Sequence, residues 1–157
     1  MAGVENRRSL KPVKDDPFDL ERFVRAQDGD YQRALAEITS GRKRSHWMWY
    51  IFPQFAGLGQ SPTSQRYAIG SLAEARAYLA HPILGPRLIA CAEAALTVSD
   101  RSAHEIFGSP DDMKLKSSAT LFTLVSSDES VFHRILKKYF DDAPNKATLE
   151  LVRSVRL

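Results

Sequence analysis

The sequence contains a single cysteine, few glycines and prolines, and no long hydrophobic run. Cys91 has no partner for an internal disulfide, and its apolar neighbours favour a packed thiol in a reducing compartment. The N-terminus lacks the apolar core of a signal peptide, and no segment approaches the length of a transmembrane helix. We therefore expect a cytoplasmic protein that does not enter the membrane.

The sequence also lacks the motifs of several common site classes. It has no phosphate-binding loop, no dinucleotide-binding glycine pattern and no nucleophile elbow. Its four histidines do not show the spacing of metal ligands, and no cysteine pair accompanies them. The net charge of +3 is mild, and no basic face or nucleic-acid-reading motif is visible. No metal, cofactor or nucleic-acid partner is expected.

Helical signals are frequent along the chain. Residues 1–16 are polar and aperiodic, which is typical of a flexible N-terminal tail, and residues 17–157 are long enough for a single helical domain. Ser71 and Ser102, each followed three residues later by Glu, form capping boxes, and Pro110 is suited to the first position of a helix that reaches about Val125. The pattern predicts an all-α fold of about seven or eight helices.

The segment from Lys43 to Ser61 differs from the helices around it because it holds both tryptophans and many other aromatics. Large side chains occupy consecutive positions from Trp47 to Phe52, which favours extended backbone, and Pro53 disfavours helical geometry at the residue before it. No second convincing strand is available to pair with this segment. We therefore predict an irregular, buried connection.

The helix expected from Pro110 carries polar residues on its apolar side. At 100° per residue, Asp112, Lys116, Thr120 and Thr123 form the predicted solvent face, whereas Lys114, Ser117 and Ser118 fall among apolar residues. One interpretation is structural: Lys114 extends to solvent at the edge, and the serines bond to carbonyls one turn earlier. The other is that these three side chains face a polar cavity and bind an anion, either a phosphate or a carboxylate.

The aromatic segment supplies further candidates for the same site. Trp47 and Trp49 are either core residues or one wall of a pocket, because indole faces stack on nucleobases and cations. His46 follows Lys43 and Arg44, whose charges favour a neutral imidazole that could act as a general base, although a hydrogen-bonded structural role is the favoured interpretation. Gln54 is an unusual residue for a core and suggests backbone or ligand contact.

Several motifs together resemble one known family. The motifs are His46-Trp-Met-Trp49, Phe52-Pro-Gln54, Gly57-Leu-Gly59, Ser61-x-x-Ser64-x-x-Tyr67, His81-Pro82-x-Leu84-Gly85, Ile106-Phe-Gly108 and Lys114-Leu-x-Ser-Ser118. They resemble a small bacterial, mostly helical domain-of-unknown-function family, some of whose members carry the automatic label calpastatin. The resemblance spans Asp16 to Leu151. It implies an irregular α-α superhelical arrangement, and it implies no activity. Calpastatin repeats are disordered inhibitory segments, so that label does not suit a capped helical chain.

Two classes of function remain open from the sequence. The first is a pocket that binds a small anionic molecule, for example a nucleotide-like one, between the aromatic segment and the Lys114 helix. Its candidate residues are Lys43, His46, Trp47, Trp49, Gln54, Ser64, Tyr67, Lys114, Ser117 and Ser118. Catalysis there, with His46 as a base and Lys114 as an electrostatic stabiliser, would suit hydrolysis, but no residue pattern specifies a reaction. The alternative is a helical protein-interaction module without catalytic activity and with an unspecified partner.

Overall fold

The structure is a computed structural model that describes residues 15–155 and is built almost wholly of helices. Within this range the elements are α2 (Glu21–Asp28), α3 (Tyr31–Thr39), α4 (Met48–Ile51), α5 (Pro62–Arg66), α6 (Leu72–Ala80), α7 (Leu84–Thr97), α8 (Ala103–Phe107), α9 (Asp111–Thr123), α10 (Val131–Tyr139) and α11 (Lys146–Val155). Among these residues, the one extended pairing is a parallel bridge between Phe55 and Ile69. The predicted all-α class is confirmed, and the short helices α4 and α5 raise the number above that expected.

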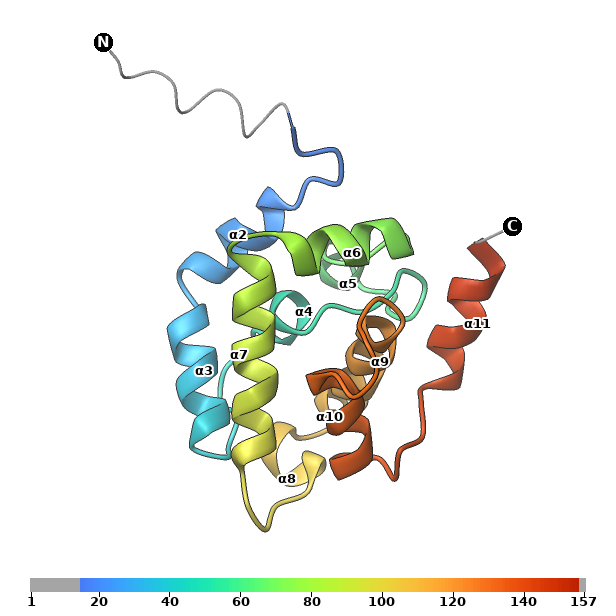
Figure 1. Ribbon diagram of the computed structural model, residues 1–157. Helices are drawn as coiled ribbons and strands as arrows, with labels where there is room; N and C mark the ends of the chain where they lie inside the picture. Colours follow the sequence, from blue (N-terminus) through green and yellow to red (C-terminus); the bar gives the residue numbers. More distant parts are fainter. Residues whose placement is uncertain (1–14, 156–157) are drawn as a thin grey trace.

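The longest helix, α7, runs alongside α3 (Figure 1). It packs against α3 on one side, α10 on the other and α6 at its N-terminal end. Helix α9 lies beside α10 and also contacts α11. It contacts α8 as well, which directly precedes it in the sequence. This arrangement brings the first turn of α9 toward the aromatic segment, which precedes it by about sixty residues in the sequence.

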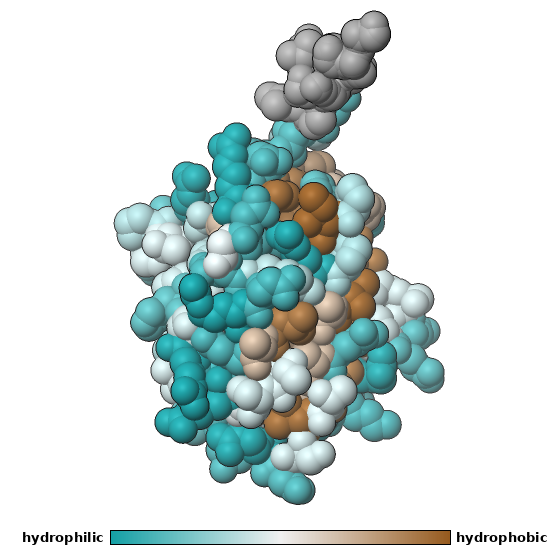
Figure 2. All heavy atoms as spheres, turned by 90° about the vertical axis from the view of Figure 1, so that its left-hand side faces the viewer, coloured by the Kyte–Doolittle hydropathy of each residue, from teal (hydrophilic) through white to brown (hydrophobic). Residues whose placement is uncertain are grey.

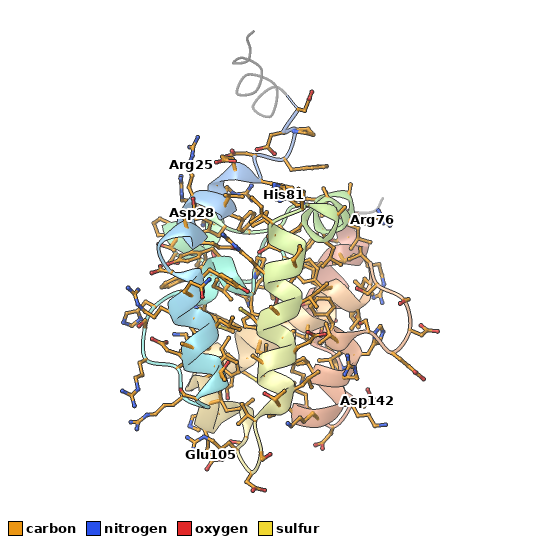
Figure 3. The ribbon with its side chains drawn as sticks, turned by 60° about the vertical axis from the view of Figure 1, so that its left-hand side comes forward. Arg25, Asp28, Arg76, His81, Glu105 and Asp142 are labelled. Carbon is orange, nitrogen blue, oxygen red and sulfur yellow. The ribbon has the colours of Figure 1, made fainter. Side chains whose placement is uncertain are left out.

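The helix boundaries follow the sequence signals closely. Ser102 and Glu105 form a complete capping box at α8. The Ser71 side chain accepts a hydrogen bond from the backbone of Glu74 at α6. His81 follows α6, and its Nδ1 accepts hydrogen bonds from the backbone amides of Ile83 and Leu84 at the start of α7 (His81 is labelled in Figure 3). Pro86 lies in the first turn of α7, where a missing backbone N–H costs little.

One cap differs from the expected residue. Asp19 is the candidate cap from the sequence, but its backbone has φ of 53° and the carboxylate of Asp16 caps α2 instead. The two carboxylate oxygens of Asp16 accept hydrogen bonds from the backbone amides of Leu20 and Glu21. The tail predicted from the sequence lies mostly in residues 1–14, which are outside the described residues.

The core is continuous from α2 to α11 and contains most of the large apolar side chains. Its largest fully buried members include Trp47, Tyr78, Phe23 and Phe122. Cys91 is buried in α7, and burial raises the pKa of its thiol to about 12, an effect that Arg87 partly offsets. The thiol therefore packs as a small apolar group, as its sequence context predicts.

The aromatic segment is more ordered than an irregular connection. Residues Met48–Ile51 form one helical turn, α4, which contacts α2 and α7, so the prediction of extended backbone is wrong at these positions. Met48 and Ile51 of this turn are buried because neighbouring helices surround it. A helical turn suits such a buried stretch because it satisfies the backbone hydrogen-bonding groups locally. Beyond Phe52 the chain is irregular, as predicted, until α5 begins at Pro62.

The orientation of α9 also differs from the prediction. Thr120, placed on the solvent face by the sequence, is completely buried, whereas Met113 is 47% exposed. The reason is that α8, α10 and α11 all pack on α9 and leave it no wide solvent face. The Thr120 hydroxyl donates to the Lys116 carbonyl and accepts from the backbone of Asn145, so its burial leaves no polar group unpaired.

The surface is mixed in polarity. Figure 2 shows apolar side chains on one face in groups that lie between hydrophilic residues. No helix between residues 15 and 155 has the length and apolar character needed to cross a bilayer.

A candidate anion-binding cavity between α4 and α9

Glu37 of α3 fixes the loop that leads into the aromatic segment. Its carboxylate accepts hydrogen bonds from the backbone amides of Arg44 and Ser45, the Ser45 hydroxyl and the Trp47 indole, at 2.6–3.0 Å. Burial raises the pKa of this carboxyl, but the four hydrogen bonds outweigh that effect and lower it to about 2. Glu37 is therefore ionised at neutral pH and holds residues 44–47 in one conformation.

Asp111, in the first turn of α9, joins two lysines that come from different parts of the chain. Its Oδ2 lies 2.8 Å from the Lys43 ammonium, and its Oδ1 lies 3.6 Å from that of Lys114. Each ammonium also lies 4.9 Å from the centre of a tryptophan ring, Lys43 at Trp47 and Lys114 at Trp49. Asp111 thus connects α9 to both tryptophans through a lysine on each side.

The two lysines differ in what remains available to a ligand. The Lys43 side chain is only 7% exposed, and its ammonium also donates to the carbonyl of Ser45. Its backbone amide donates to the Ile106 carbonyl at 2.7 Å, which fastens this part of the chain to α8. Lys114 is about a fifth exposed and makes only the longer contact with Asp111. The Lys43 ammonium is therefore occupied by contacts within the protein. The Lys114 ammonium can still donate a hydrogen bond to a further acceptor.

A concave site of about 390 Å³ lies at this junction. Its lining consists of Lys43, Arg44, Ser45, His46, Met48, Trp49, Phe107, Ser109, Pro110, Asp111 and Lys114. The volume is within the usual range of small-molecule sites. Two lysines and one arginine line the site beside one carboxylate, so basic side chains outnumber acidic ones in the lining. Among residues 15–155, the Arg44 guanidinium has no acceptor or ion-pair partner, and it is exposed.

A second, smaller cavity of about 100 Å³ is lined by the aromatic segment together with α5 and the residues that follow it. Gln54, Ser64 and Tyr67 line it together with Trp49, which also lines the larger cavity. The Ser64 hydroxyl accepts a hydrogen bond from Ser61, and the Tyr67 ring packs edge-on against Tyr50. The candidate residues from the aromatic segment are therefore divided between two cavities that share the Trp49 side chain.

Three of the sequence-derived candidates lie away from both cavities. Trp47 is completely buried and belongs to the core, with its indole N–H bonded to Glu37. Ser117 is buried and donates to the Met113 carbonyl one turn earlier, which is the structural interpretation of that residue. Ser118 is 1% exposed, and its hydroxyl has no hydrogen-bond partner in the described chain. Neither serine belongs to the lining of either cavity.

Sequence reasoning missed Glu37, Arg44 and Asp111 as parts of the site. The three-residue spacing of Asp111 and Lys114 on a helix was a usable signal, because such pairs face each other. Arg44 lies two residues before His46, within the aromatic segment. Glu37 gave no comparable signal, since its partners lie in a loop up to ten residues away, whose path depends on tertiary packing.

The larger cavity brings together groups that can bind an anion. A guanidinium, an ammonium and an imidazole from Arg44, Lys114 and His46 line the site beside an indole face. His46 is exposed, and no described side chain orients its imidazole, so no catalytic pair is assembled around it. Among residues 15–155, no group of three or more His, Cys, Asp or Glu side chains converges in a way that could hold a metal ion.

Fold and site together define a small all-α protein with a cation-rich cavity beside a tryptophan. The chain belongs to the family described as "Protein of unknown function (DUF1810)", which it matches over residues 17–152. The resemblance drawn from the sequence motifs is therefore confirmed, and the matched range nearly coincides with the expected one.

A solved structure extends the comparison to the fold. The crystal structure of the conserved hypothetical protein Rv1873 from Mycobacterium tuberculosis is 49% identical in sequence, with a TM-score of 0.86. The similarity covers 88% of this chain and 99% of that one. No curated protein matches the sequence significantly. The relatives thus support the helical architecture and leave the chemistry of the cavity to be argued from its residues.

Proposed function

We propose that the protein binds a small anionic molecule in the cavity between α4 and the first turn of α9. The observation that carries the proposal is that Lys114 of α9 lines one concave site with Arg44, His46 and Trp49, which come from a distant part of the sequence. Asp111 is the only carboxylate in the lining, and it engages both lysines. The site therefore retains uncompensated positive charge that a phosphate or carboxylate would complement.

The positions of Arg44 and Lys114 support a ligand role over a purely structural one. A surface arginine needs no partner, but Arg44 is held beside the cavity by the Glu37 hydrogen bond to its backbone amide. Lys114 lies over the Trp49 ring, which limits its motion and keeps its ammonium at the site. A ligand anion would meet an ammonium held over the Trp49 ring and a guanidinium carried by a fixed stretch of backbone, and such preorganisation favours binding.

The alternative proposal is a helical protein-interaction module. The observation in its favour is that Ile83 and Ile89, near and within α7, are each about two-fifths exposed. The other large apolar side chains exposed in the described range are Met113, Leu124 and Val155, which belong to or adjoin other helices. Because these residues do not lie on one element, we favour the cavity as the functional site.

A thermal-shift screen against nucleotides, sugar phosphates and small carboxylates tests the proposal. We expect at least one anionic class to raise the melting temperature of the wild-type protein. Arg44→Ala and Lys114→Ala should each weaken binding about tenfold or more, because each removes a charge-assisted hydrogen bond. Lys146→Ala is the matched control, since it removes an exposed lysine at the start of α11.

Two results would contradict the proposal. One is the absence of any stabilising anion in the screen at millimolar concentration. The other is stabilisation that persists unchanged in both Arg44→Ala and Lys114→Ala, because the anion would then be bound elsewhere. The Trp47 position is unsuitable for this test, because truncating a completely buried tryptophan would destabilise the core.

A further inference from the structure

Trp49 lines both cavities, and the two cavities differ in chemistry. This arrangement indicates a ligand with two chemically different parts, an inference that rests on the proposed function. One cavity is larger and cationic, with Arg44, His46 and Lys114 in its lining. The other is small and neutral, with Gln54 and Tyr67 in its lining. Because Trp49 lines both, the two volumes adjoin a single side chain. A molecule that fills both would pass along this residue.

The smaller cavity is suited to a compact planar group. Its volume of about 100 Å³ is below the roughly 150 Å³ of a cavity known to hold a benzene ring, so it has room for a ring edge or an amide. Its lining includes the backbone of Gly57 and Gly59, which adds few side-chain atoms. The remainder of such a ligand, together with its charged group, has to occupy the larger cavity.

Gln54 lines the smaller cavity with a side-chain amide that is free to bond. It is half-buried, its backbone carbonyl accepts from the Ile69 amide at 2.9 Å, and no described group bonds to its side-chain amide. Two neighbouring hydroxyls each accept one hydrogen bond, Ser64 from Ser61 and Tyr67 from Arg66. A carboxamide offers a donor and an acceptor side by side, which matches a planar edge that presents the complementary pair.

We infer that the ligand is a mononucleotide-like molecule, with its phosphate at Arg44 and Lys114 and the edge of its heteroaromatic base at Gln54. Nucleobase edges carry adjacent donors and acceptors, and glutamine recognises such an edge through paired hydrogen bonds. The phosphate supplies the negative charge that the larger cavity lacks. The sugar connects the two groups past the Trp49 side chain. A free phosphate or a sugar phosphate would use only the cationic half of this site.

Calorimetric titration of the full chain separates the two halves of the site. The probes are inorganic phosphate, ribose 5-phosphate, the four ribonucleoside 5′-monophosphates and the four corresponding nucleosides. We expect at least one monophosphate to bind at least tenfold more tightly than ribose 5-phosphate, and its nucleoside to bind more weakly than the monophosphate. Gln54→Ala should abolish the tenfold advantage and leave the affinity for ribose 5-phosphate unchanged.

The controls distinguish failure of this inference from failure of the proposed function. Gln32→Ala removes an exposed glutamine of α3 and should change no affinity. If all monophosphates bind no more tightly than ribose 5-phosphate, or if Gln54→Ala weakens both equally, the two-part ligand is wrong while anion binding stands. If no phosphate-bearing probe binds, or if Lys114→Ala changes no affinity, the anion site is wrong and the inference fails with it.

Discussion

At the scale of single residues, Glu37 has the widest influence on the site without lining it. One carboxylate accepts four hydrogen bonds and so determines the path of residues 44–47. Arg44 and His46 reach the cavity only because this loop is held in place. The residue illustrates how a charged side chain from a neighbouring helix can arrange a site made mainly by others.

Glu37→Gln should lower the free energy of unfolding by about 1 to 2 kcal/mol at pH 7, because a neutral amide replaces an anionic acceptor at a partly exposed position. Urea denaturation measures the change, and Glu93→Gln, on the exposed side of α7, is the control. Equal stability of Glu37→Gln and the wild type would show that the hydrogen bonds contribute nothing net.

The same carboxylate predicts a pH dependence with a defined sign. Folding lowers the pKa of Glu37 from its ordinary value of 4.5 to about 2, so its ionised form stabilises the fold above pH 4.5. This contribution is lost as the pH falls from 4.5 toward 2. The difference in urea midpoint between the wild type and Glu37→Gln should therefore shrink between pH 6 and pH 3. A difference that is constant with pH would contradict the assignment.

At the scale of elements, the end of α6 and the start of α7 approach each other closely at the backbone. Gly85 lies where a Cβ atom would collide with the backbone carbonyl of Leu79. Gly85→Ala should therefore destabilise the protein by about 2 to 3 kcal/mol, measured by thermal or urea unfolding. Gly29→Ala is the matched control, because no atom lies within 4 Å of a Cβ there and its φ is −92°. Similar stability of the two variants would contradict the close packing.

The elements also show how far the sequence predicts this structure. Capping signals placed α6 and α8 correctly, because Ser71 and Ser102 act through hydrogen bonds local to their own helices. The burial of Thr120 and the helical turn from Met48 depend instead on which helices surround them. For the site, sequence pattern indicated the aromatic segment and Lys114, but the exclusion of Ser117 followed only from the packed orientation of α9.

At the scale of the whole molecule, Arg22 ties together three parts of the chain. Its guanidinium donates to the backbone carbonyls of Phe18, Asp19, Arg66 and Ala68, and it forms a 2.9 Å ion pair with Glu74 of α6. Both side chains of the ion pair are nearly buried. The chain before α2, the segment after α5 and the start of α6 are therefore connected by one side chain.

Arg22→Lys should lower the free energy of unfolding by about 2 to 3 kcal/mol, because an ammonium cannot reproduce the planar set of donors and leaves buried acceptors unpaired. Urea denaturation measures the loss. Arg25→Lys is the control, because Arg25 projects from the same helix at the surface and makes only a 3.8 Å contact with Glu21 (Figure 3). A loss no larger for Arg22→Lys than for Arg25→Lys would contradict the proposed role.

The central claim, that the cavity between α4 and α9 binds an anionic ligand, is tested most directly by the two tryptophan indole N–H signals in a ¹H–¹⁵N NMR spectrum. Trp49→Phe assigns them by the loss of one signal. During titration with nucleoside monophosphates, the Trp49 signal should shift and saturate, because this residue lines the site. The buried Trp47 indole, bonded to Glu37, should shift much less. No saturable shift of Trp49 with any monophosphate would contradict the account.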